Sequence, residues 1–264
     1  FGFGPLPALG IAGAWLALVI YYVIGSVVLA FNLLWGNSGL RLSFRHSLRR
    51  RYFADILGVG SMGVVNNVVA NAAVVVATAL VGPLGTHALA GFGLGIRLEY
   101  LQIPIVFGFG TGMVAMVGMN VGAGQFARAR AIAWTGALVG AVVTETVGLA
   151  AAIFPHTWLG LFTSDAEAIA VGTEYLRVVA PAYGLFGFGL ALYFAGQGAR
   201  RMRWPVAAGI ARLVVIAAVG TVALRILDAG LAGVLLAVVA ALAVYAAIHA
   251  VPWLRGSALA RAPV

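Results

Sequence analysis

The stretch Gly108–Arg130, GFGTGMVAMVGMNVGAGQFARAR, decides the fold of this chain. It is an apolar, glycine-rich segment that leads into a turn bearing arginines. Four of its glycines stand in two pairs at a spacing of four residues: Gly108 and Gly112, and Gly118 and Gly122. This spacing leaves one face of a helix without side chains, so another helix can approach closely. Arg128 and Arg130 are typical of a helix end that meets anionic lipid headgroups, so the stretch predicts a membrane boundary.

The composition of the whole chain also indicates a membrane protein. Of its 264 residues, 63% are hydrophobic and only 9% are charged, and the mean hydropathy is +1.06. A water-soluble core could not cover that much apolar surface, so we expect a polytopic membrane protein. The net charge of +9 comes from arginines in short clusters between apolar segments, a pattern that argues against nucleic acid as a partner.

Several absences from the sequence exclude classes of chemistry. The chain has no cysteine, which excludes disulfides and cysteine-bound metal, and all 16 basic residues are arginine, which excludes a lysine Schiff base. The four histidines are dispersed without the spacing of metal ligands. The glycine-rich run at 91–95 lacks the preceding strand and the following lysine of a nucleotide-binding loop. We therefore predict neither a catalytic site nor a metal or cofactor.

Seven segments are long enough to cross about 30 Å of hydrocarbon at about 1.5 Å per residue. Their expected limits are 9–34, 56–82, 87–121, 131–154, 168–197, 205–227 and 231–254. They lack the alternation of apolar and polar residues that a membrane β-barrel requires. The predicted fold class is therefore all-α, a polytopic membrane protein with seven transmembrane helices.

Arginines gather in every second connection between these segments. They follow the first, third, fifth and last segments: Arg41, Arg45, Arg49, Arg50 and Arg51; Arg128 and Arg130; Arg200, Arg201 and Arg203; Arg255 and Arg261. The alternate connections carry Asp165, Glu167 and Asp228. By the positive-inside rule the arginine side is cytoplasmic. We then expect the N-terminus of the chain outside the cell membrane and the C-terminus inside.

An internal similarity suggests how the chain is organised. GIAGAWLALV at 10–19 and GLAGVLLAVV at 230–239 share six identities in ten, which predicts that the first and last helices are equivalent members of two repeated halves. The chain also begins at Phe1 without a signal peptide, so we expect a fragment that lacks an N-terminal lobe. The expected parts are the last helix of that lobe at 1–35, an arginine-rich cytoplasmic linker at 36–55, a six-helix C-terminal lobe at 56–254 and a cytoplasmic tail at 255–264.

The third segment holds two charges at a depth where charges are costly. A charged side chain near the bilayer centre costs about 2.5–3.5 kcal/mol on insertion scales, so it needs a partner or a task. Arg97 and Glu99 are two residues apart, which places them on different faces of a helix. Glu99 shares its face with Gln102, and Pro104 predicts a kink beside it. We expect either a buried ion pair with another helix or a substrate or ion pathway that includes Glu99, Arg97 and Gln102.

Polar residues on two further segments are candidates for the same pathway. Asn67 and Asn71 lie on one stripe of the second segment, where their amides need partners on other helices or contact a ligand. Tyr193 and Gln197 share a face at the inner end of the fifth segment and could line a pathway.

The fourth and sixth segments each carry one charge within the membrane. Glu145 lies mid-span between two threonines, and Arg212 lies in the first third of its segment. We expect these two residues to form an intramembrane charge network in which they neutralise one another. This interpretation favours a structural pair over a proton relay.

Several of these stretches resemble one known family. VGMNVGAGQFARAR at 117–130 is similar to the signature that follows the second helix of each half in the multidrug and toxic compound extrusion family, with Met119 where that family commonly has glutamine. Further similar stretches occur in the expected order: LGIAGAWLALVI at 9–20, the segment 79–124, WLGLFTSDAEAIAVGTEYLRVVAP at 158–181 and LYFAGQGARRMRWP at 192–205. Together they cover most of the chain.

The resemblance implies a transporter with twelve helices in two six-helix lobes. Many cation-coupled members have one carboxylate on the helix that matches the second expected segment and another on the helix that matches the fifth. Here the former has only asparagines, Asn66, Asn67 and Asn71, and the latter has no acid inward of Glu174. Glu99 is therefore the candidate for coupling in this lobe.

The function implied by the resemblance is that of a drug antiporter in the bacterial inner membrane. It would exchange H⁺ or Na⁺ inward for amphipathic, often cationic compounds outward by alternating access. The expected partners are the lipid bilayer, these small molecules and the missing N-terminal lobe. Two alternatives stay open, namely a flippase for lipid-linked precursors from the same superfamily and a seven-helix receptor or membrane scaffold.

Overall fold

The computed structural model describes residues 10–35 and 50–256, which are almost entirely helical and contain no strand. The chain forms two compact units, Phe1–Phe53 and Ala54–Val264. The first unit contains α1, Gly10–Trp35, an apolar helix that carries no charged residue. Most of the expected linker and nearly all of the expected C-terminal tail lie outside the described residues.

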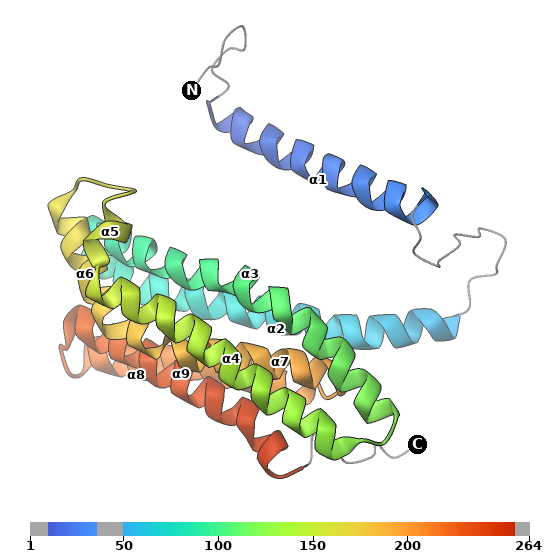
Figure 1. Cartoon of the computed structure of the whole chain (residues 1–264). Helices are drawn as coiled ribbons and strands as arrows, with labels where there is room; N and C mark the ends of the chain where they lie inside the picture. Colours follow the sequence, from blue (N-terminus) through green and yellow to red (C-terminus); the bar gives the residue numbers. More distant parts are fainter. Residues whose placement is uncertain (1–9, 36–49, 257–264) are drawn as a thin grey trace, which may run out of the picture. The chain divides into compact units, whose positions relative to one another are not determined.

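The second unit is a bundle of helices (Figure 1). Its elements are α2 (Arg50–Val81), which starts in the first unit, η1 (Gly82–Leu84), α3 (Thr86–Gly122), α4 (Phe126–Ile153), α5 (Pro155–Leu159), α6 (Ala166–Val179), η2 (Ala180–Ala182), α7 (Tyr183–Gly198), α8 (Arg203–Arg225) and α9 (Gly230–Leu254). In the described part of the chain, seven helical spans are long and apolar enough to cross a membrane, with α6 to α7 counted as one span. The predicted all-α polytopic fold is confirmed.

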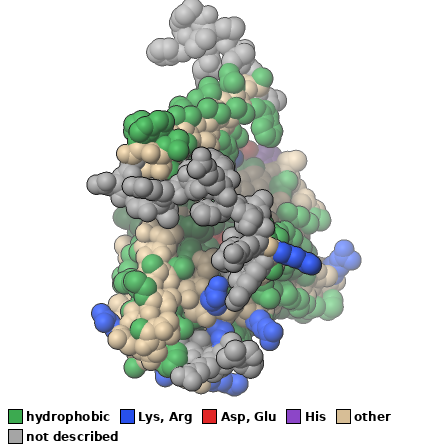
Figure 2. All heavy atoms as spheres, turned by 90° about the vertical axis from the view of Figure 1, so that its right-hand side faces the viewer, with side chains coloured by type: hydrophobic (Ala, Val, Ile, Leu, Met, Phe, Trp, Pro, Cys, Tyr) green, Lys and Arg blue, Asp and Glu red, His purple; other side chains and the backbone are tan. Residues whose placement is uncertain are grey.

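Arginines mark one end of this bundle. Figure 2 shows their side chains gathered at the end where α4 and α8 begin and where α7 and α9 finish. Arg128 and Arg130, which we expected in a loop, belong to the first turns of α4, because that helix already begins at Phe126. Arg130 Nη2 donates a hydrogen bond to the carbonyl oxygen of Leu254 at 3.1 Å, so the start of α4 lies level with the end of α9.

The glycines of α3 that are four residues apart are mostly not the ones that pack against another helix, contrary to our expectation. Of Gly108, Gly112, Gly118 and Gly122, only Gly118 closely approaches another described residue, with a β-carbon position 3.3 Å from the carbonyl oxygen of Gly198. The tighter approach is at Gly110, against the ring of Phe194 on α7. The physical reason is the register of the helix, since its buried face here runs through Val106, Gly110, Met113 and Val117. The sequence spacing identified the helix but not the face in contact.

The fifth span is interrupted, whereas the sequence predicted an unbroken helix at 168–197. Pro181 has no amide hydrogen and lies in η2, between α6 and α7. Two side chains of α4 satisfy backbone groups beyond this break. Thr144 Oγ1 donates to the Tyr183 carbonyl oxygen at 2.9 Å, and the Gly184 amide donates to Glu145 Oε2 at 2.6 Å. In a bilayer such freed groups need protein partners, so α4 supports the break.

A polar contact joins α3 and α6 at the opposite end of the bundle from the arginines. Asp165 is the N-cap of α6, where its Oδ1 accepts from the Glu167 and Ala168 amides at 3.0 and 3.3 Å. His87 Nδ1 lies 2.8 Å from Asp165 Oδ2. The hydrogen bond from the His87 ring, followed by that from the Ala168 amide, holds the pKa of Asp165 below its ordinary value of 3.8.

Gly148 is where α4 approaches the break most closely. A β-carbon at Gly148 would collide with the Ala180 carbonyl oxygen, whereas none of the described residues lies within 4 Å of one at Gly93 on α3. We therefore expect Gly148→Ala to destabilise the bundle by about 1–3 kcal/mol through overpacking. Thermal unfolding in detergent, followed by circular dichroism, measures the effect. Gly93→Ala is the control and should be neutral or slightly stabilising; equal effects of the two substitutions would contradict the tight contact.

The capping contact at Asp165 predicts a pH dependence of stability. Because its folded-state pKa is lowered, the carboxylate contributes stability that is present above about pH 4 and is lost as the pH falls through the lowered pKa. Asp165→Asn keeps a capping side chain but removes the charge. The melting temperature of this variant should lie below that of the unmodified chain at neutral pH, and the two should converge in acid. A difference that stays constant with pH would refute this role.

Candidate functional site

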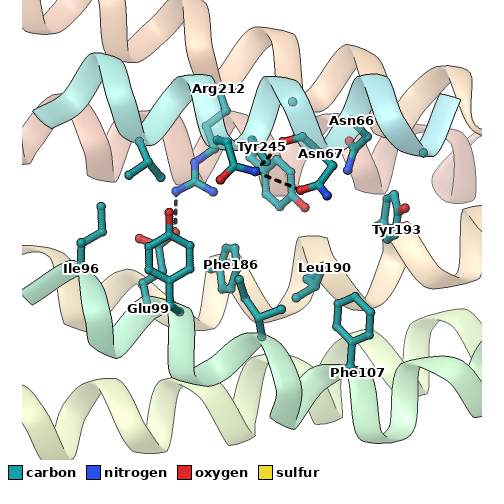
Figure 3. Close-up of a pocket in the computed structure, with 17 residues that line it drawn as sticks. Asn66, Asn67, Ile96, Glu99, Phe107, Phe186, Leu190, Tyr193, Arg212 and Tyr245 are labelled. Atoms are coloured by element: carbon teal, nitrogen blue, oxygen red, sulfur yellow. Dashed lines mark hydrogen bonds and ion pairs between the residues drawn. The ribbon is translucent and has the colours of Figure 1, made fainter. Parts of the chain in front are cut away.

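A cavity of about 270 Å³ lies within the second unit among α2, α3, α7, α8 and α9 (Figure 3). Apolar side chains such as Phe107, Phe186 and Leu190 form part of its wall. The polar side chains that line it come from all five helices: Asn66, Asn67, Asn71, Glu99, Tyr100, Tyr193, Arg212 and Tyr245. The cavity thus combines aromatic surface with amide, hydroxyl and charged groups.

A buried ion pair is the central feature of the cavity. Arg212 Nη2 on α8 donates to Glu99 Oε1 on α3 at 2.6 Å, and the two residues are only 7% and 5% exposed. The guanidinium carbon of Arg212 also lies 5.6 Å from the centre of the Phe186 ring and 5.8 Å from that of Tyr245. Aromatic faces at these distances attract a cation. The pair therefore connects α3 to α8 and lies beside rings of α7 and α9.

The ion pair leaves hydrogen-bonding capacity on both partners. Glu99 Oε2 and Arg212 Nε are buried, and neither has a hydrogen-bond partner among the described residues. Buried polar atoms without a partner are uncommon, so each such atom calls for an explanation. Both belong to residues that line the cavity, where a bound molecule could offer a donor or an acceptor.

Asn71 of α2 hydrogen-bonds to Asn67, one turn away on the same helix. Asn71 Nδ2 donates to the Asn67 carbonyl oxygen at 2.9 Å and to Asn67 Oδ1 at 3.0 Å. We expected these two amides to bond to other helices or to contact a ligand. The hydrogen bonds between them instead stay within α2. One turn of helix brings the side chains together, and both line the cavity, where Figure 3 shows Asn67.

The structure brings five of the nine sequence-derived candidates together at the cavity and leaves four apart from it. Asn67, Asn71, Glu99, Tyr193 and Arg212 all line the cavity. The other four do not: Arg97, Gln102, Gln197 and Glu145. The guanidinium carbon of Arg97 lies 5.6 Å from the centre of the Phe162 ring, outside the cavity. Gln102 is fully buried, and its amide atoms have no hydrogen-bond partner among the described residues.

The expected charge network between Glu145 and Arg212 is wrong. Arg212 pairs with Glu99, and Glu145 accepts the Gly184 amide at the break between α6 and α7. For Glu99 we expected either a buried ion pair with another helix or a place in a substrate or ion pathway. The structure contains the buried ion pair. The sequence could not select this pairing, because several buried charges of each sign were available and their depths alone did not distinguish them.

Sequence reasoning missed two aromatic residues that flank Arg212. Tyr245 is the one tyrosine in the last apolar segment, a signal that could have identified it. Phe186 carried no such signal, since phenylalanine is common in membrane helices. Tyr245 also contacts His249, whose ring centre lies 4.3 Å from that of the tyrosine, so the polar region of the interior continues along α9.

The chain matches one family model and several curated proteins. The MatE model matches residues 64–223. The FAD transporter of Shewanella oneidensis is 25% identical over 217 residues, which cover 82% of this chain and 48% of that protein. The multidrug resistance protein NorM of Burkholderia vietnamiensis is 24% identical over 256 residues, which cover 81% of this chain and 54% of that protein. The chain thus spans about half the length of the curated relatives it matches.

Solved structures give the same fold. An outward-facing conformation of a multidrug resistance MATE family transporter of the MOP superfamily matches with a TM-score of 0.86 at 21% identity, over 95% of this chain and 57% of that one. A bent form of the Vibrio cholerae MATE transporter VcmN matches with a TM-score of 0.70 at 18% identity, over 80% and 48% of the two chains.

The ion pair predicts a strong coupling between two substitutions. Arg212→Met leaves Glu99 buried without its partner, which should cost about 3–5 kcal/mol of unfolding free energy. Glu99→Met alone should lower the free energy of unfolding by a similar amount, because it leaves Arg212 buried without a charged partner. The double variant replaces both charges with apolar side chains and should recover most of the loss. Thermal unfolding of the four proteins measures this coupling, and additive effects would show that the pair contributes no interaction energy.

Proposed function

Because the chain belongs to the MatE family, whose members are transporters and not enzymes, we propose that it forms one lobe of a secondary transporter that works by alternating access. The described residues hold seven apolar spans, and the chain is a multi-pass membrane protein. The other wall of the transport pathway would come from a second lobe, in line with the relatives, of which this chain covers only about half.

The observation that carries this proposal is the Glu99–Arg212 ion pair at the wall of the cavity. Both side chains are buried inside an apolar bundle, yet both line a space large enough to admit a small molecule or ions. A purely structural pair would be better placed away from any cavity. A pair beside a cavity can instead respond to what enters it, by protonation of the acid or by contact with a bound cation.

We assign the coupling role to Glu99. Protonation of its carboxyl would cancel one charge of the pair and weaken its hold on Arg212, so the contact between α3 and α8 would change. A ligand shifts a conformational equilibrium only as far as it binds the two states differently, and this contact provides such a difference. H⁺ is the simplest coupling ion for a single carboxyl, and Na⁺ would act by the same neutralisation. Each charge that moves through the membrane field contributes about 2.3 kcal/mol per 100 mV.

The substrates proposed for the complete transporter are amphipathic, often cationic compounds, exported as drugs or other xenobiotics. The aromatic wall of the cavity suits flat apolar surfaces, and the asparagines of α2 offer hydrogen bonds without a net charge. The relatives differ in what they are named for, FAD in one case and multidrug resistance in the other. A direct comparison of a cationic dye with a flavin nucleotide would decide between these classes.

The proposed location is the bacterial inner membrane, with the arginine-bearing end of the bundle in the cytoplasm. Arg128, Arg130, Arg203 and Arg255 lie at that end, whereas Asp165 and Glu167 lie at the other. This asymmetry favours the proposed orientation by the positive-inside rule. The N-terminus of the chain would then lie outside and its C-terminus inside.

The sequence left two alternative functions open, a seven-helix receptor or scaffold and a flippase. A seven-helix receptor or scaffold is not carried forward, because the family consists of transporters. A flippase for lipid-linked precursors stays a prediction, which the number of spans and the charge of the central cavity in the full-length protein would test.

The coupling role of Glu99 is tested in the full-length protein that carries this chain. In membrane vesicles, Glu99→Gln should lower the rate of proton-driven ethidium transport by about tenfold or more and flatten its pH dependence, because the amide cannot exchange a proton. Arg97→Gln is the matched control, since this charge lies on the same helix but outside the cavity. Equal amounts of protein and similar melting temperatures must accompany the comparison. Unchanged transport and pH response in Glu99→Gln would remove Glu99 from the mechanism.

A further inference from the structure

A second hollow of the bundle, with a volume of about 740 Å³, lies between α4, α7 and α9. It shares no lining residue with the cavity at Glu99 and uses a different face of α7, with Gly184, Leu185 and Phe188. We call it the lateral groove. Its α9 side consists of small side chains only: Ala243, Ala246, Ala247 and Ala250.

The lateral groove extends along most of the membrane thickness. Arg130 and Leu254 bring the start of α4 level with the end of α9, so the two helices can be compared in height. The groove reaches Ala250, about 6 Å from the end of α9, and Leu149, about 6 Å from the opposite end at Ile153. Val142, Leu149 and Leu185 on its rim are exposed. An elongated apolar chain fits a recess of this shape.

One carboxylate lies in this mostly apolar groove. Glu145 is the charged residue that lines the groove, about 12 Å from the end of α4 and therefore within the hydrocarbon region. Its Oε2 accepts the Gly184 amide at 2.6 Å, near the amino end of α7, where a negative charge is favoured. Among residues 10–35 and 50–256, no cationic side chain pairs with it.

We propose that the lateral groove binds a single-chain amphipathic cation from the surrounding bilayer, with its cationic group at Glu145 and its alkyl chain along the alanines of α9. An uncompensated carboxylate at this depth is costly, and a cation neutralises it. Two other occupants, helix α1 and a second copy of this chain, do not. Helix α1 carries no charged residue, and a second copy that met this groove symmetrically would add another carboxylate. The proposal needs only binding and does not depend on transport.

The test uses two brominated probes that differ only in charge. Bromine quenches tryptophan fluorescence on contact, and Trp134 lies about 16 Å along α4 from Glu145, with its ring centre 5.9 Å from that of Phe188 in the groove. With its head at Glu145, ω-bromoundecyl-trimethylammonium can place its bromine near Trp134. The full chain in phosphatidylcholine nanodiscs is titrated with this probe and with neutral ω-bromoundecanol. The difference between the unmodified chain and Trp134→Phe isolates the signal of Trp134.

Glu145→Gln is the decisive variant, because its amide oxygen can still accept the Gly184 hydrogen bond while the charge is lost. We expect saturable quenching by the ammonium probe, weakened about tenfold in Glu145→Gln, with an unchanged response to the alcohol. An unchanged melting temperature of the variant would show that the loss is one of binding. Equal quenching by both probes, equal affinity in Glu145→Gln, or no quenching of Trp134 because another segment or a second copy covers the groove would each overturn the proposal.

Discussion

An arginine inside a hydrocarbon bilayer cannot lose its charge, so the surrounding helices must provide a partner for it. In this bundle Glu99 provides the partner, and the rings of Phe186 and Tyr245 surround the guanidinium group. Four helices, α3, α7, α8 and α9, therefore converge on Arg212. The cavity lies beside this point, where α2 contributes mainly asparagines and small residues.

The backbone at the break between α6 and α7 also needs partners from the protein, as the buried arginine does. Pro181 prevents a continuous helix, and freed amide and carbonyl groups find no water in the membrane core. Thr144 and Glu145, adjacent on α4, satisfy one carbonyl and one amide just beyond the break. Glu145 thus has a structural contact through one oxygen, and it also lines the lateral groove.

Much of the fold could be predicted from the sequence, because long apolar segments and clustered arginines are direct consequences of the bilayer. The arrangement of the candidate site was harder to predict from the sequence. The polar candidates Glu99, Asn67 and Tyr193 were found because polar groups stand out in apolar helices. The hydrogen-bonding partners of these residues could not be predicted, because pairing depends on the rotation and tilt of the helices, and composition does not encode either. Arg212 was assigned to Glu145 for this reason, and the hydrogen bonds of Asn67 and Asn71 were sought on other helices although they lie one turn apart.

The exclusive use of arginine has a consequence for the end of the bundle where α4 and α8 begin. A guanidinium group stays protonated over the whole physiological pH range, whereas clusters that include histidine would titrate. The attraction between Arg128, Arg130, Arg203 and Arg255 at this end and an anionic lipid surface therefore does not depend on a titrating side chain. Acid stress can alter carboxyl groups inside the lobe while these arginines keep their charge at the membrane surface.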